Sequence, residues 1–238
     1  MTLFRRLPAV KYGPERGYSE VLPAWKGGTV VCMATGPSLT DAQIETVRLA
    51  RERGDVSGVV VLNDNYRRVP WADLLYFADQ KWWHWHKDKP ELAAFGGETC
   101  TIDTGPKSAG WDSTHILRNL GGEGLSVEPG GLRTGINTGH QILNIATLAG
   151  ADRVLLLGYD ARHADDKRVH WFGDHPDRTG PPFSEMLRHM RTTLPVLQSL
   201  GVKVINCTPG SAIDCFERGT IESLVADSQG AALPARCL

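Results

Sequence analysis

The sequence predicts an α/β fold in which a mostly parallel sheet carries helices on both faces, together with a small irregular lid or insertion. Short apolar runs recur along the chain, and segments with helical periodicity separate them. Strands that are apolar on both sides are typical of a covered parallel sheet. The length of 238 residues suits one domain that is large enough to bury a substantial core.

Five apolar runs are the predicted core strands, and each is flanked by Gly, Asp or Asn on at least one side. They are Thr29–Ala34, Val56–Leu62, Leu74–Phe77, Val154–Leu157 and Val202–Ile205. Weaker strand signals lie at Thr99–Ile102 and Leu125–Val127. Both fall in residues 84–132, which have many glycines and tryptophans and little regular pattern. This middle stretch is predicted to be an inserted subdomain or a substrate lid.

Capping signals and apolar spacing predict the helices between these strands. Thr40 and Gln43 form a capping box, and Leu39 with Ile44 forms a hydrophobic staple. A helix is therefore predicted to begin directly after Thr40. An apolar stripe over residues 142–149, which ends before a glycine, predicts a second helix.

A third helical pattern runs from Phe183 to Leu200. Pro195 lies inside it, so we expect a kink or two separate helices. Residues 1–27 are rich in Pro, Gly and charge, and are predicted to form an arm that lies on the main domain, residues 28–226. Residues 227–238 are predicted to be a loose tail.

Composition limits the partners and the compartment. Lys and Arg number 26 against 27 Asp and Glu, so the overall charge favours neither nucleic acid nor an anionic membrane as a partner. No run approaches the roughly 20 apolar residues of a membrane span. The cysteines are odd in number and show no CxxC spacing, and the sequence shows no signal peptide. This pattern favours free thiols in a reducing cytoplasm over disulfides. The five are Cys32, Cys100, Cys207, Cys215 and Cys237.

Tight polar turns follow the predicted strands, and in a parallel sheet these turns meet at one edge. The first turn, ATGPSLT, places Gly36 between a buried strand and a helix start. Backbone N–H groups and a helix N-terminus at that point favour a phosphate. An ordinary strand-to-helix turn that needs glycine is the alternative. The turn matches neither GxGxxG nor the P-loop pattern.

Polar residues follow other strands as well. Asn63 opens the run NDN after the second strand, where an amide could bind a base or ribose, or merely form a polar turn. Asp79 follows the third strand, and the histidines of the WWHWH stretch beyond it are predicted to pack at the surface. Asn137 or Thr138 is a predicted helix N-cap in a glycine-flanked turn that also suits an anion.

The last two strands also end in polar residues. Asp160 follows the most apolar strand, where it could bind Mg²⁺, hold a hydroxyl or cap the loop. Thr208 and Ser211 lie in the turn after the final strand. The loop HADDKRVHWFGDHPDR contains His170 and His175, and histidine suits general-base work near neutral pH. A divalent metal site and a solvated loop are the alternatives, although this loop has neither HxH nor HExxH spacing.

Taken in order, these motifs resemble a known group of proteins. The xGPSL turn, NxxY after a strand, NTG before a helix, GxD, HWFG followed by histidine, and CTPGS are similar to those of the bacterial lipooligosaccharide sialyltransferases. They also resemble motility accessory factor proteins, archaeal-type 6-hydroxymethylpterin pyrophosphokinases and phage-encoded proteins. The resemblance covers about residues 28–220 and is weak over 84–132. It implies a single Rossmann-like nucleotide-binding domain.

The resemblance implies a nucleotide site along one edge of the sheet. The first turn would line the phosphates, Asn63 would face the nucleotide, and NTG corresponds to a cytidine contact. Asp79 stands where the sialyltransferases have an asparagine. The predicted nucleotide-binding residues are Thr35, Gly36, Pro37, Ser38, Asn63, Asp79, Asn137, Thr138, Gly139, Gly158, Thr208 and Ser211.

The resemblance also implies the catalytic groups. His175 corresponds to the general base of the family, with Asp174 as a one-residue insertion, and His170 is the second candidate. Arg162 occupies about the position where the sialyltransferases have a tyrosine that helps the leaving phosphate, and a fixed positive charge could serve the same end. Asp160 completes the predicted catalytic set.

Three functions follow as expectations. The first is a sialyltransferase-like glycosyltransferase that moves a CMP- or other nucleotide-activated sugar to a small-molecule or glycan acceptor, with no cofactor required. The second is an ATP-dependent pyrophosphokinase, with Mg²⁺ held by Asp160 or Asp79. The third is a non-catalytic nucleotide-binding or phage assembly module. The tryptophan-rich middle is a candidate contact for a homo-oligomer or a lid.

Overall fold

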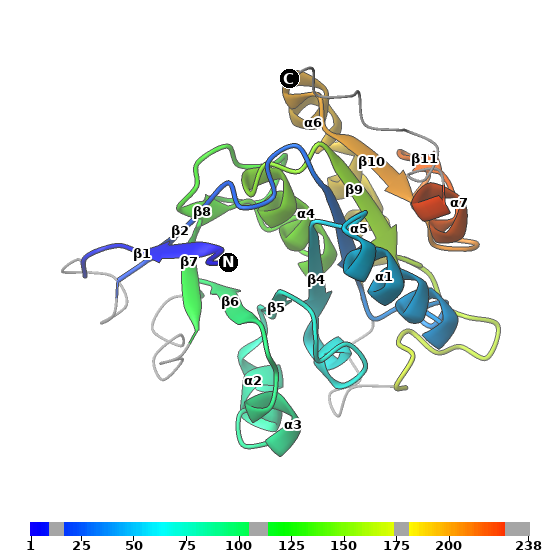
Figure 1. Cartoon of the computed structure of the whole chain (residues 1–238), viewed down its shortest axis with the longest axis horizontal. Helices are drawn as coiled ribbons and strands as arrows, with labels where there is room; N and C mark the ends of the chain where they lie inside the picture. Colours follow the sequence, from blue (N-terminus) through cyan, green and yellow to red (C-terminus); the bar gives the residue numbers. More distant parts are fainter. Residues whose placement is uncertain (10–16, 105–113, 174–180, 227–238) are drawn as a thin grey trace, which may run out of the picture.

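The computed structural model describes residues 1–9, 17–104, 114–173 and 181–226. Its centre is a sheet of nine parallel strands in the order β11-β10-β9-β3-β4-β5-β6-β7-β8 (Figure 1). The predicted α/β fold is therefore confirmed. The strands are β3 Thr29–Met33, β4 Gly58–Leu62, β5 Leu74–Tyr76, β6 Glu98–Ile102, β7 His115–Asn119, β8 Gly131–Leu132, β9 Arg153–Leu157, β10 Lys203–Asn206 and β11 Glu217–Arg218.

Helices cover both faces of this sheet. Alternate side chains of β3 explain why, since Val30 and Cys32 lie in the apolar cluster beneath α4, whereas Val31 and Met33 lie in the cluster beneath α1. Both faces are apolar and both must be covered. The helices are α1 Asp41–Arg53, the 3-10 helix η1 Asn63–Arg67, α2 Gln80–His86, α3 Pro90–Ala93, α4 Thr138–Leu148, α5 Phe183–Arg191, α6 Leu194–Leu200 and α7 Ile221–Ala226.

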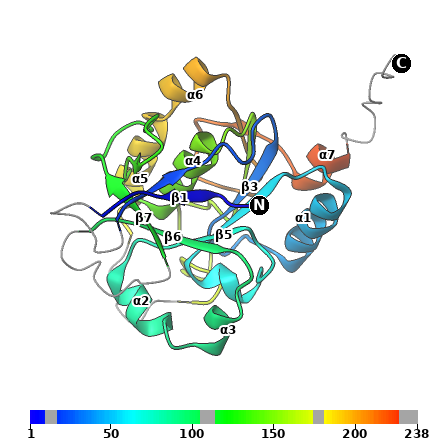
Figure 2. The same cartoon turned by 60° about the vertical axis from the view of Figure 1, so that its left-hand side comes forward.

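The strand order reverses at β3. The chain adds β4 to β8 in one direction, crosses back through α4, and then adds β9, β10 and β11 on the other side of β3. Consequently α1 and α4 lie on opposite faces of the sheet (Figure 2). Open α/β sheets bind ligands at the carboxyl ends of the strands, next to such a switch point. The turns after β3 and β9 lie at this place.

Local signals place the helix ends as predicted. The capping box forms, because Gln43 N donates to Thr40 Oγ1 at 3.2 Å and Thr40 N donates to Gln43 Oε1 at 3.1 Å. Asn137 caps α4 through its side-chain oxygen, which accepts from the Gly139 N–H. The long helical pattern divides into α5 and α6, with Pro195 in the first turn of α6.

The described part of residues 84–132 extends the sheet instead of forming a separate subdomain, because β6, β7 and β8 continue it beyond β5. The weak strand signal at Thr99–Ile102 corresponds to β6. The signal at Leu125–Val127 is not a strand. There the Ser126 N–H donates to Asn144 Oδ1, and Asn144 Nδ2 donates to the Ser126 carbonyl, each at 2.8 Å. A side chain of α4 takes the place of a strand partner.

The N-terminal residues contain regular structure that the sequence does not predict. β1 (Phe4–Arg6) and β2 (Ser19–Val21) pair in antiparallel fashion within the expected arm. Leu3 and Trp25 are buried in the core beside them. The expected tail, residues 227–238, lies outside the described residues.

The cysteines in the described part of the chain are free thiols, as predicted. Burial raises the pKa of Cys207 to about 12 and also raises that of Cys32, so both stay protonated near neutral pH. Cys237 lies outside the described residues. None of the described helices has the length and apolar character needed to cross a bilayer.

Candidate functional site at the strand switch point

The turn after β3 makes close contact with the residues that follow β9. Ser38 Oγ donates to Asp160 Oδ2 at 2.7 Å, and Ser38 N donates to Asp160 Oδ1 at 3.3 Å. A Cβ on Gly36 would lie 1.9 Å from Asp160 Oδ2, so only glycine admits the carboxylate at this distance. Sequence reasoning assigned these residues to one site, and the fold brings them together.

Three other N–H groups of this turn, those of Gly36, Leu39 and Thr40, are bonded within the protein. Gly36 N donates to the Gly158 carbonyl at 2.9 Å, and Leu39 N donates to the Gly36 carbonyl at 3.2 Å. The capping box uses Thr40 N, and Pro37 has no N–H. Ser38 is therefore the residue of this turn whose N–H and hydroxyl both donate to a carboxylate, that of Asp160.

Asp160 is a poorly solvated anion, with 6% of its surface exposed. Burial raises the pKa of the Asp160 carboxyl above its ordinary value, while the two hydrogen bonds from Ser38 and the charge of Arg162 oppose this rise. The carboxylate thus depends on Ser38 for much of its stabilisation.

His170 lies on the other side of the same turn. Its Nδ1 is 2.9 Å from the Thr35 hydroxyl, and the next N–H, that of Trp171, donates to the Thr35 carbonyl at 2.9 Å. An imidazole from the histidine loop is thereby fixed against the end of β3. His175, the other candidate base, lies outside the described residues.

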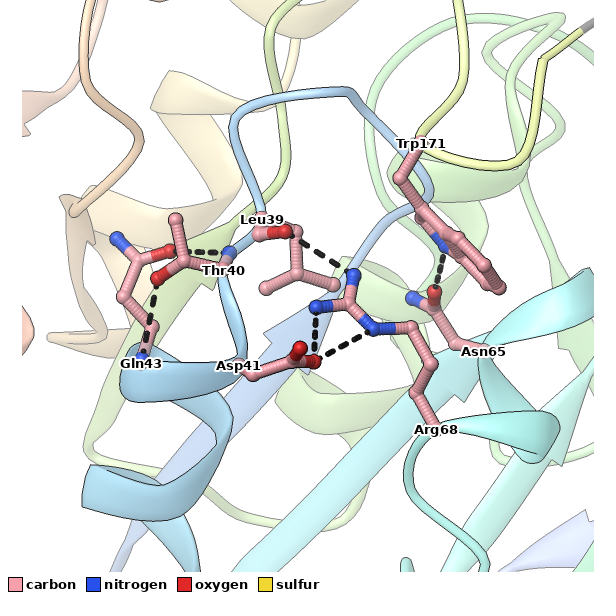
Figure 3. A network of polar contacts seen from close by, with 7 residues as sticks. All are labelled: Leu39, Thr40, Asp41, Gln43, Asn65, Arg68 and Trp171. Atoms are coloured by element: carbon pink, nitrogen blue, oxygen red, sulfur yellow. Dashed lines mark hydrogen bonds and ion pairs between the residues drawn. The ribbon is translucent and has the colours of Figure 1, made fainter.

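Trp171 anchors this loop, a role that the sequence does not indicate. Its Nε1 donates to Asn65 Oδ1 at 2.7 Å (Figure 3). Asn65 is fully buried, and its Nδ2 donates to the carbonyls of Met33 and Ala34, each at 2.9 Å. One amide therefore joins the ends of β3 and β4 to the histidine loop.

Arg68 completes the anchor by lying over the ring of the indole. Its guanidinium carbon lies 4.9 Å from the centre of the Trp171 ring, a cation–π distance. The same guanidinium donates to the Leu39 carbonyl at 3.0 Å and pairs with Asp41 at the start of α1 (Figure 3). The side chains of this network, Asn65, Arg68 and Trp171, are called the tryptophan anchor below.

The turns after β9 and β10 are hydrogen-bonded to each other next to the site. Tyr159 N donates to Thr208 Oγ1 at 3.0 Å, and Ser211 Oγ donates to the Tyr159 carbonyl at 2.5 Å. The Tyr159 hydroxyl donates to the Gly139 carbonyl at 3.0 Å, which ties the start of α4 to the same place. In this structure Thr208 and Ser211 brace the backbone beside Asp160.

Unusual backbone angles gather at this edge of the sheet. Positive φ occurs at Asn63 (43°) after β4, at Ile136 (48°) before α4 and at Ala161 (48°) after β9. Such angles are costly for residues other than glycine, and they cluster at ligand sites. Asn63 Oδ1 is also buried, with no hydrogen-bond partner among the described residues.

Two predicted residues have local structural contacts. Asp79 caps α2, because its Oδ1 accepts from Lys81 N at 2.8 Å. Arg162 is exposed, and its Nε donates to the Gly210 carbonyl at 2.7 Å. Thr138 begins α4. Asp79 and Thr138 follow the carboxyl ends of strands, and so lie at the carboxyl edge of the sheet. Among the contacts of the described residues, neither forms a hydrogen bond with Ser38 or Asp160.

No family model and no curated protein sequence matches this chain. The function is therefore inferred from the geometry of the switch point.

Two further observations bear on ligands. Across the described residues, no group of three or more His, Cys, Asp or Glu side chains is arranged to hold a metal ion. A cavity of about 450 Å³ lies at the opposite, amino edge of the sheet, where Trp25, Trp71 and Glu98 are among the lining residues. None of the predicted site residues lines this cavity.

Proposed function

We propose that the chain is a nucleotide-dependent transferase, of the sialyltransferase-like glycosyltransferase type, that uses a CMP- or other nucleotide-activated sugar. One observation carries this proposal: at the switch point, the turn after β3 contacts both a carboxylate and an imidazole. Ser38 binds Asp160, and Thr35 binds His170. Switch points of open parallel sheets are where such folds bind nucleotides.

The proposed chemistry assigns a role to each group. A histidine, His170 or His175, accepts the proton of an acceptor hydroxyl as its oxygen forms a bond to the anomeric carbon. The bond from that carbon to the donor phosphate breaks, and the nucleotide leaves with the electron pair. Arg162 stabilises the charge that develops on this phosphate. The acceptor is a small molecule or a glycan.

The Ser38–Asp160 contact supports an alternative, the ATP-dependent pyrophosphokinase. Mg²⁺ is bound in such enzymes by one or two carboxylates together with substrate phosphates and waters. Asp160 is a carboxylate next to a candidate phosphate turn, so the residues present fit this ion. Asp160 would hold Mg²⁺, and the ion would neutralise charge on the transferred phosphates.

Thermal unfolding with CMP, CDP, UDP, GDP and ATP, with and without Mg²⁺, tests these proposals. A nucleotide at 100 times its Kd stabilises the folded state by about 2.7 kcal/mol, which raises Tm by roughly 5–10 °C for a chain of this size. A shift by CMP or CDP supports glycosyl transfer, and a shift by ATP with Mg²⁺ supports pyrophosphoryl transfer. No shift with any nucleotide would contradict both, and would also count against a nucleotide-binding module.

A further inference from the structure

We propose that the Asp160 carboxylate occupies the position in the turn after β3 that a ligand phosphate would take, which makes Asp160 a specificity-determining residue. The site then admits a phosphate together with a divalent cation and disfavours the free anion. The inference deepens the proposed function and rests on its nucleotide site, because it concerns the same turn, and it departs from the expectation that glycosyl transfer requires no cofactor.

Hydrogen-bond accounting is the first argument. Gly36 N donates to the Gly158 carbonyl, Leu39 N to the Gly36 carbonyl and Thr40 N to the Gln43 side chain. Ser38 directs both its N–H and its hydroxyl to Asp160, at 3.3 and 2.7 Å. A phosphate that bound this turn through Ser38 would compete with the Asp160 carboxylate for the same two donors.

Space is the second argument. The carboxylate lies so close to Gly36 that a Cβ there would be 2.7 Å from Asp160 Cγ and 1.9 Å from Oδ2. Glycine at such a turn ordinarily lets a ligand approach the backbone. Here the chain's own carboxylate makes that approach, and Asp160 is 6% exposed.

Charge is the third argument. Two unit negative charges about 4 Å apart, at an effective dielectric constant near 20, repel strongly enough to weaken binding by up to about 1,000-fold. Arg162 is the cation whose charge acts on Asp160, and it is exposed and bonded to the Gly210 carbonyl. A divalent cation between the carboxylate and the phosphate would turn this repulsion into attraction.

The test compares wild-type protein with Asp160→Asn by calorimetric titration of CMP, CDP, UDP, GDP and ATP, in excess Mg²⁺ and in EDTA. Asparagine keeps the size and an acceptor oxygen but removes the charge. Asp165→Asn is the matched control, because Asp165 is an exposed acidic residue a few positions along the chain. We expect wild type and Asp165→Asn to bind at least about tenfold more tightly with Mg²⁺ than in EDTA. For Asp160→Asn we expect equal affinities in the two buffers, and tighter binding in EDTA than wild type.

Two results would overturn the inference while leaving the proposed function intact. They are wild-type binding that is equally tight in EDTA, and a Mg²⁺ dependence that Asp160→Asn retains. No binding by wild type or by Asp160→Asn in either buffer would overturn the proposed function and the inference with it. If Asp160→Asn does not fold, proton relaxation by Mn²⁺ decides the matter with wild-type protein. Enhancement of the proton relaxation rate by Mn²⁺ must then require the protein and a nucleotide together. The absence of this enhancement contradicts the inference.

Discussion

The tryptophan anchor yields a prediction that can be worked out from its contacts. Trp171→Phe keeps an aromatic ring near Arg68 but removes the Nε1–H that donates to Asn65 Oδ1 at 2.7 Å. Because Asn65 is fully buried, its oxygen loses a partner that water does not readily replace. Leaving a buried acceptor unsatisfied costs about 1–3 kcal/mol.

This cost should fall on the loop, not on the whole fold. The loop is held to the core through Thr35 and Asn65, whereas the central sheet has its own contacts on both faces. We therefore expect the Trp171 segment to open more readily in Trp171→Phe, with exchange of its backbone N–H groups faster by about 5- to 150-fold. Exchange in β3 should remain at the wild-type rate.

Hydrogen exchange followed by mass spectrometry measures this effect directly. Trp83→Phe is the control, since Trp83 lies in α2 and stacks on Phe77, which is not part of the tryptophan anchor. Equal exchange of residues 168–173 in Trp171→Phe and wild type would refute the role of the anchor. Equal acceleration throughout the chain would refute its local character.

Three other predictions follow from the same structure. Gly36→Ala should lower the free energy of unfolding by more than about 2 kcal/mol in urea titrations, because its Cβ would lie 1.9 Å from Asp160 Oδ2. Gly96→Ala, whose Cβ would have its nearest contact at 3.5 Å, should lower the free energy of unfolding much less. Burial lowers the pKa of His140 to about 4, so between about pH 4 and 6.5 the unfolded state binds more protons than the folded state. The stability that this histidine contributes above about pH 6.5 should therefore be lost as the pH falls towards 4. A His140→Gln variant whose stability keeps the full wild-type pH dependence would contradict this. Turnover assays of His170→Ala and His175→Ala should show at least about a 100-fold loss in the variant that lacks the general base, with nucleotide affinity nearly unchanged, and full activity in both would exclude these bases.

Much of the fold is predictable because its signals are local. The apolar run of β3 and the capping box after it identify a strand, a turn and a helix within about 25 residues, and the structure confirms all three. Pro195 likewise marks the break between α5 and α6. Backbone hydrogen bonding and side-chain volume decide such features from neighbouring residues alone.

The remaining features depend on contacts between distant parts of the chain. Ser38 and Asp160 are 122 positions apart, and Asn65 and Trp171 are 106 apart. A tight turn that contains Gly36 predicts an anion, but the chain's own Asp160 carboxylate accepts the two Ser38 donors of that turn. β7 has apolar Ile116 and Leu117 followed by the exposed polar residues Arg118 and Asn119, too short a pattern to predict a strand. Only the packed sheet supplies its partners.

Amide NMR spectra of the isotope-labelled protein, recorded as nucleotide and Mg²⁺ are added, test the central claim most directly. We predict that the largest shifts occur at Ser38, Asp160 and Trp171, at the carboxyl edge of the sheet. Shifts concentrated instead at Trp25 and Gly97, beside the amino-edge cavity, would contradict the claim, as would spectra that do not change.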